Sequence, residues 1–284
     1  MKILSALVII CIVGLVSTSF AQEIPTPVKA KIVSNIQSIK PWDSFKLGVL
    51  FEIDPGWHIY WKYPGETGLP TKLKFSVPDG YQVSEVMWPV PSVYNKYNGG
   101  KDFGYETSVL LWTDIKVPSN VQMDQIAKIE TQISWISCKE ICIPGKENLV
   151  YDATVSEQTK LAGEDLFSKW HNYLPVVIGD RENPFNFSVV TTKLGDDIAK
   201  VVLEVKNKTH NGEIEYYPNP DDSLVIQDLK YIKSEDEGVT EISFDVQAQD
   251  GVLFSESVLG GLIVYSDGEK KRSAVEIKID FNDT

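Results

Sequence analysis

The chain has 284 residues, of which 43% are hydrophobic, and it carries a formal net charge of −13 at pH 7. That length is enough for one large domain or for two domains of ordinary size. So acidic a surface repels nucleic acid and anionic lipid, and we therefore expect neither as a partner.

The first 21 residues have the features of a secretory signal peptide. Lys2 precedes an apolar run from residue 3 to residue 16, and small residues follow this run up to Ala21. The run is shorter than the roughly 18 residues of a membrane-spanning helix, and no basic stop-transfer flank follows, which argues against an uncleaved anchor. We expect cleavage near Ala21 and a periplasmic or otherwise exported, soluble mature chain without a membrane span.

Patterns typical of β strands recur from residue 28 to residue 155. They consist of alternating or β-branched residues separated by Pro, Gly and Asp. The clearest segments are 46–53, 73–77, 109–117, 129–135 and 149–155. Strands at this spacing predict an antiparallel sandwich of the immunoglobulin type.

One helical pattern follows these strands. Residues 157–174 contain no proline, and their apolar side chains recur at four-residue intervals, as on one face of an amphipathic helix. These side chains are Ala162, Leu166, Trp170 and Leu174. We expect Ser156 to cap this helix at its start and Pro175 to end it.

Strand patterns resume after the helix, at 185–190, 199–205, 223–226, 240–246 and 274–279. The predicted fold class is therefore all-β, with two immunoglobulin-like antiparallel β-sandwich domains joined by a helical connector. A single large barrel is the alternative. The expected boundaries are a signal peptide at 1–21, a first sandwich at 22–155, the connector at 156–176 and a second sandwich at 177–284.

Two cysteines, Cys138 and Cys142, remain when the signal peptide is removed together with Cys11. An even number of cysteines fits a disulfide in an exported protein. A disulfide across so short a loop stabilises the fold by only about 2 kcal/mol, against roughly 4.7 kcal/mol for a hundred-residue loop. A reversible redox pair and a local structural staple therefore both stay open.

A metal site is a weaker interpretation of the same pair. Tetrahedral zinc takes four ligands, and only His58, His171 and His210 could supplement the two thiols, none at a ligand-like interval. Two thiolates can bind copper(I), so this metal stays open. We expect no metal, and no cofactor beyond a redox-active disulfide.

Three stretches carry a family resemblance: DPGWHIYWKYPGETGLP at 54–70, KDFGYETSVLLW at 101–112 and SCKEICIPGK at 137–146. Together they resemble the periplasmic amino-terminal, immunoglobulin-like domain of the DsbD family of thiol:disulfide interchange proteins, which includes relatives linked to copper tolerance. The likeness covers roughly residues 28–155 and includes the cysteine pair.

The resemblance implies a protein-disulfide reductase that passes reducing equivalents to oxidised periplasmic proteins. In this reaction Cys142 would form the mixed disulfide with a partner, and Cys138 would resolve it. The other site residues that the resemblance implies are a cap loop with Asp102, Phe103 and Tyr105, and flanking aromatic positions at His58 and Tyr60.

The resemblance does not extend to the membrane domain or the thioredoxin-like domain of the family. We therefore expect a separate protein to supply the electrons, either a membrane electron conduit or a thioredoxin-like donor. The alternative function is a non-catalytic periplasmic binding or assembly protein with a structural disulfide.

The alternation of side chains along a strand also predicts which residues near His58 share a face. In a strand, the side chains of His58, Tyr60 and Lys62 share one face, and those of Trp57, Ile59 and Trp61 share the other. We expect the tryptophan face in the core. The histidine face is either plain surface or lines the site, where an imidazole could accept a thiol proton.

Two further expectations concern the surroundings of the cysteines. Phe103 and Tyr105 flank Gly104 in a predicted loop, where we expect them to shield the pair rather than fill a core edge.

Cys138 ends a predicted strand and should be the better buried cysteine. Pro144 should leave the chain irregular, and therefore open to approach, near Cys142.

Overall fold

The computed structural model describes residues 26–65, 67–95, 100–176, 185–207, 212–220, 223–233, 238–249, 252–254, 257–266 and 272–281. The predicted signal peptide at 1–21 lies outside these residues. In the part of the chain that is described, no helix is both long enough and apolar enough to cross a membrane.

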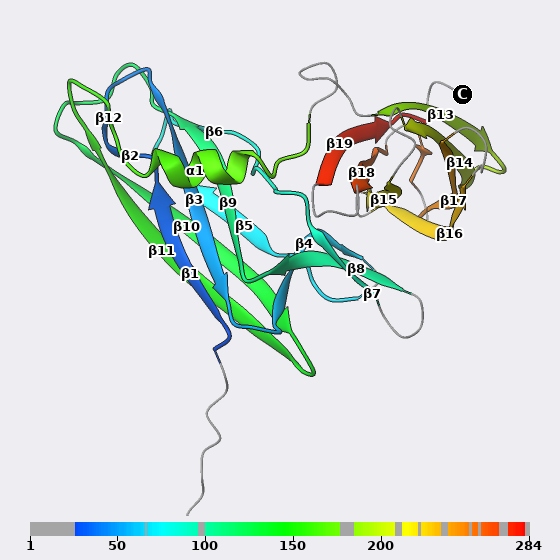
Figure 1. The fold of residues 1–284 in the computed structure, drawn as a ribbon. Coiled ribbons are helices and arrows are strands. Elements are labelled where there is room, and N and C mark those ends of the chain that lie inside the picture. Colours follow the sequence, from blue (N-terminus) through cyan, green and yellow to red (C-terminus); the bar gives the residue numbers. More distant parts are fainter. Residues whose placement is uncertain are drawn as a thin grey trace, which may run out of the picture.

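The amino-terminal half forms a sandwich of two sheets (Figure 1). The first sheet has the strand order β1 (Val28–Ser34), β3 (Ser44–Ile53), β9 (Ser108–Lys116) and β6 (Gln82–Val83). The second has the order β12 (Lys160–Leu161), β2 (Ile36–Ile39), β11 (Cys142–Val155), β10 (Ile126–Cys138), β4 (His58–Gly65), β8 (Lys101–Glu106) and β7 (Ser92–Asn95), and β5 (Lys72–Ser76) also pairs with β10.

The alternation along strand β10 shows why one face of the second sheet is exposed to solvent. Its residues alternate between exposed and buried from Ile126 to Ile133, because successive side chains of a strand point to opposite faces. The inward residues Ile133 and Trp135 join a core with Phe51 of β3 and Leu111 of β9. The other face of β10 and its partner β11 is turned to solvent.

The helix is shorter than the pattern predicted. Helix α1 spans Glu164–His171, and Gly163, with φ of 69°, stands at its N-cap in place of Ser156. The preceding residues extend along β2 as strand β12 instead, and the Asn35 side chain donates a hydrogen bond to Glu164 Oε2 (2.9 Å). Phe167 is the residue that α1 buries, in a cluster with Leu110 and Trp112 of β9.

The carboxy-terminal half forms a second sandwich. One sheet has the order β13 (Phe185–Lys193), β14 (Ile198–Asn207), β17 (Val239–Ala248) and β16 (Leu224–Lys233), and the other has the order β15 (Glu213–Pro220), β18 (Leu259–Ser266) and β19 (Arg272–Ile279). These two sheets enclose a core of their own. The fold class is therefore confirmed as all-β with two sandwiches, while the exact domain boundaries stay a prediction.

The two sandwiches share an apolar contact. Strands β4 and β8 of the first face the sheet of β15, β18 and β19 in the second (Figure 1). Tyr217 and Leu262 of the second sandwich belong to the same buried cluster as Trp61 and Phe103 of the first. Two ion pairs cross the same contact, Lys62–Glu276 at 3.1 Å and Lys101–Glu215 at 2.7 Å.

Candidate functional site

Cys138 and Cys142 form a disulfide at the tip of the β10–β11 hairpin, with their Cα atoms 4.1 Å apart. The turn between them is closed by a hydrogen bond from the Lys139 amide to the Ile141 carbonyl (3.0 Å). Cys138 is only 4% exposed, whereas Cys142 is exposed. The prediction that Cys138 is the better buried cysteine is therefore confirmed.

The strand register places charged and aromatic side chains next to this disulfide. Cys138 lies opposite Cys142 on one side and opposite His58 of β4 on the other. His58 in turn lies opposite Glu106 of β8. Because directly opposed side chains point to the same face of a sheet, these four residues form one row across four adjacent strands.

A small aromatic cluster surrounds His58. Its ring stacks on Tyr94 of β7, with centroids 4.4 Å apart, and meets the edge of Tyr60 at 5.1 Å. Burial raises the pKa of the Tyr94 phenol, and the negative charge of Glu106 raises it further. Tyr94 and Glu106 are site neighbours that sequence reasoning missed, because only the pairing of β7 and β4 with β8 brings them to His58.

Asp102 has a structural role beside this cluster. It is 2% exposed and accepts hydrogen bonds from the Thr67 amide (3.1 Å) and the Thr67 hydroxyl (2.8 Å). The pKa of Tyr60 is raised, first by burial and then by the charge of Asp102, while a hydrogen bond with Thr67 lowers it in part. Asp102 therefore fixes the segment after β4 against the aromatic cluster.

The expectation that Phe103 and Tyr105 shield the cysteines is wrong. Both lie in strand β8, not in a loop, and their side chains join the buried core together with Ile59, on the face opposite to His58. Phe103 is 3% exposed, and its ring lies 4.7 Å from the Tyr217 ring of the second sandwich. The Tyr105 hydroxyl donates to the Pro89 carbonyl (2.7 Å). These aromatic residues therefore fill an edge of the core.

The strand near Cys142 is regular, also against expectation. Pro144 pairs with Ile136 within an unbroken ladder. Cys142 is open to approach for another reason. Among the described residues, β11 pairs with a second strand, β2, only at Thr154 and Val155. Cys142 therefore stands on a free strand edge, a position that tolerates proline.

Within the described ranges, no group of three or more His, Cys, Asp or Glu side chains is arranged to hold a metal ion. His58 adjoins the cysteines, whereas His171 lies in α1 and His210 falls outside the described residues.

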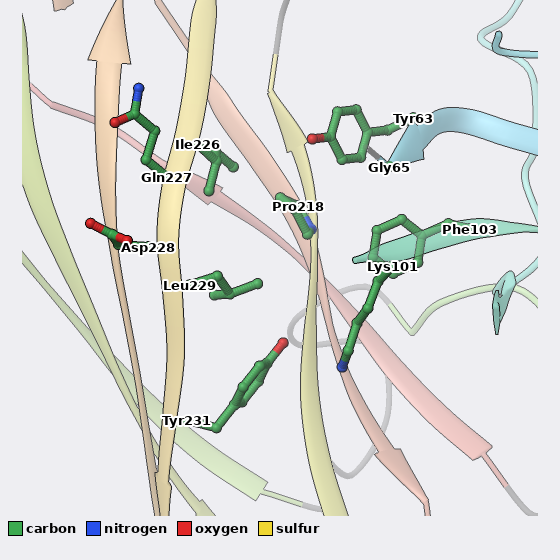
Figure 2. Close-up of a pocket in the computed structure, with 10 residues that line it drawn as sticks. All are labelled: Tyr63, Gly65, Lys101, Phe103, Pro218, Ile226, Gln227, Asp228, Leu229 and Tyr231. Atoms are coloured by element: carbon green, nitrogen blue, oxygen red, sulfur yellow. The ribbon is translucent and has the colours of Figure 1, made fainter. Parts of the chain in front are cut away.

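A separate cavity of about 220 Å³ lies between the two sandwiches (Figure 2). Figure 2 shows Phe103 and Lys101 on one side of it and Leu229 and Tyr231 of β16 on the other. The Lys101 ammonium group lies 5.1 Å from the centre of the Tyr231 ring. Since Phe103 belongs to the inner face of the sheet, this cavity is separate from the disulfide.

Residues 25–153 match the model of the family described as "Thiol:disulfide interchange protein DsbD, N-terminal". A comparison with curated proteins found no match. Among solved structures, the N-terminal periplasmic domain of ScsB from Proteus mirabilis has 17% sequence identity and a TM-score of 0.63, over 90% of this chain and 94% of that one. At this identity the likeness shows a shared fold.

Two other solved structures have much lower TM-scores. A conserved domain protein from Bacillus anthracis has 10% identity and a TM-score of 0.23, over 91% of this chain and 88% of that one. A protein of unknown function from Porphyromonas gingivalis W83 has 10% identity and a TM-score of 0.24, over 89% of this chain and all of that one.

Proposed function

We propose, on the premise that residues 25–153 belong to the family of amino-terminal domains of the thiol:disulfide interchange protein DsbD, that this protein reduces disulfides of partner proteins through Cys138 and Cys142. The site of action would be the periplasm or another exported location. A thioredoxin-like protein or a membrane electron conduit would return the pair to the dithiol form.

The observation that carries this proposal is the unequal exposure of the two bonded cysteines. Cys142 is exposed on a free strand edge, so a partner disulfide can approach its sulfur. Cys138 is buried beside His58, so a partner sulfur reaches it poorly. This arrangement supports the proposal that the sulfur of Cys142 attacks a partner and the sulfur of Cys138 releases it.

The reaction has two balanced steps. The Cys142 thiolate attacks one sulfur of the partner disulfide, which forms a mixed disulfide and expels the other partner sulfur as a thiolate. The Cys138 thiolate then attacks the Cys142 sulfur and expels the second partner thiolate. Two electrons pass to the partner, and the two protons of the original dithiol end on the two partner thiols.

His58 would assist the second step. Its imidazole stands in the row next to Cys138, where it can accept the proton of that thiol, and only the thiolate is a nucleophile. The stacked Tyr94 ring would hold the imidazole in place. We therefore assign His58 as a proton acceptor and Tyr94 as a positioning residue.

A redox titration tests the proposal. The purified protein is equilibrated in glutathione and dithiothreitol buffers, and free thiols are alkylated and counted by mass spectrometry. We expect half-reduction at a potential between about −120 and −270 mV, the range of proteins that exchange disulfides. A bond that stays oxidised below about −300 mV would instead indicate a structural disulfide in a binding or assembly protein.

A further inference from the structure

Four lysines line a groove on the outer face of the sheet that carries the disulfide. Lys146 of β11 and Lys72 of β5 flank Ser134 of β10 on its two sides, in one row across three strands. Lys74 lies two residues further along β5, and Lys62 of β4 lines the same groove of about 610 Å³. We call Lys62, Lys72, Lys74 and Lys146 the lysine groove.

The lysine groove and the disulfide share one face. Cys142 and Lys146 are four residues apart on β11, and Cys138 and Ser134 are four residues apart on β10. Because the side-chain period of a strand is two, an even spacing keeps both on the same face. At about 3.3 Å per residue, the lysine groove begins roughly 13 Å from the exchanging sulfur. One docked protein can therefore cover both.

The lysine groove is positively charged, although the chain as a whole is acidic. The protein carries −13 overall, yet among the described residues only Lys62 of the four forms an ion pair, with Glu276. Lys72, Lys74 and Lys146 are exposed, and like charges gathered on one sheet face repel one another. Of the exposed carboxylates on this face, Glu106 and Glu140 lie at the disulfide end. Glu130, two residues beyond Gln132 of the groove on β10, forms an ion pair with Lys128 (3.0 Å).

We propose that the lysine groove docks an acidic segment of the partner whose cysteines exchange with Cys142. The inference rests on the proposed function and adds the class of partner to it. Lysines in an otherwise acidic surface steer such a segment toward this face and away from the rest of the molecule. The docked segment would bring the partner disulfide to the exposed edge of β11.

Disulfide-linked dimers of three short peptides provide the probes: CGGEEE, CGGSSS and CGGKKK. Their spacers let the charged end reach the lysine groove while the cysteine reaches Cys142. Exchange with the fully reduced protein is followed by mass spectrometry of quenched samples at several salt concentrations. We expect the acidic dimer to react about tenfold faster than the neutral dimer at low salt, with this advantage lost as salt rises.

Two variants with the same change in charge test whether the faster reaction of the acidic dimer depends on the lysine groove. The groove variant carries Lys72→Glu, Lys74→Glu and Lys146→Glu, and the control carries Lys193→Glu, Lys200→Glu and Lys278→Glu at exposed positions of the second sandwich. The groove variant should lose the preference for the acidic dimer, while the control should keep most of it. A milder variant carries Gln in place of Lys72, Lys74 and Lys146, and its preference for the acidic dimer should lie between that of the groove variant and that of the unaltered protein. This variant replaces the groove variant in the comparison if the charge reversal impairs folding.

The outcomes separate the two proposals. Equal rates for all three dimers, or equal losses in the groove variant and the control, would overturn the docking inference and leave the proposed function in place. A failure of every dimer to exchange would overturn the proposed function and, with it, the inference.

Discussion

Cys138 lies directly opposite His58 in the ladder between β10 and β4, on the side away from its disulfide partner Cys142. This register places the buried cysteine next to a histidine whose ring is stacked on Tyr94. The relationship links the sequence around residue 58 to the chemistry proposed for a hairpin about 80 residues later in the chain.

His58→Phe should slow the release of a partner from the mixed disulfide. A phenyl ring keeps the stack with Tyr94 but cannot accept the thiol proton, so we expect roughly tenfold slower release near pH 7 and a pH profile displaced to higher pH. Stopped-flow measurement of release between pH 5 and 9 checks this. Tyr94→Phe, which keeps its ring, is the matched control, and an unchanged profile in His58→Phe would contradict the assigned role.

Replacing both cysteines should cost little stability. Cys138→Ser combined with Cys142→Ser should lower the free energy of unfolding by about 2 kcal/mol or less, because the loop is short and the β10–β11 ladder already holds the hairpin together. Urea denaturation of the oxidised protein and the double variant measures the difference. A double variant that fails to fold would support a structural staple instead.

Phe103→Ala should affect stability rather than redox chemistry. The ring is buried against Tyr217 at the contact of the two sandwiches, and removing a buried phenylalanine side chain costs about 3–5 kcal/mol. Denaturation should show that loss, while the reduction potential of the disulfide should stay unchanged. A shift in potential without a loss of stability would return Phe103 to the shielding role that its position in β8 argues against.

Alkaline pH should destabilise the second sandwich and the contact between the sandwiches. Burial raises the pKa of Tyr231 to about 12 and raises those of Tyr216 and Tyr217 as well. The folded state therefore holds these protons more tightly than the unfolded state, whose phenols titrate near about 10. The contribution of Tyr231 is complete below that pH and is lost as pH rises from there through about 12, and the contributions of Tyr216 and Tyr217 are lost at higher pH still. Denaturation midpoints at pH 8 and pH 11, with tyrosinate absorbance, test the sign.

The sequence predicted those features that depend on local periodicity. Alternation identified the strands, and it correctly placed Ile59 and Trp61 in the core and His58 on the opposite face. The end of the β10 pattern correctly indicated that Cys138 is buried.

Features that depend on pairing between distant segments were not predictable. Gly104 between two aromatic residues suggested a loop, but β8 is held as a strand by β4 and β7. Its register turns Phe103 inward, and the neighbouring pairing with β7 brings Tyr94 to His58. The helix pattern from residue 157 was overridden because Lys160 and Leu161 could add to β2. In each case tertiary pairing decided what local composition left ambiguous.

The central claim is that Cys142 exchanges with partners and Cys138 resolves the product. The most direct measurement is a non-reducing gel of periplasmic extracts containing Cys138→Ser or Cys142→Ser protein, each probed with an antibody to this chain. Cys138→Ser should accumulate a mixed disulfide, because the exposed Cys142 still attacks and no second thiol releases the partner. Cys142→Ser should trap little, because Cys138 is buried beside His58. Equal trapping by both variants, or trapping by neither, would contradict the account.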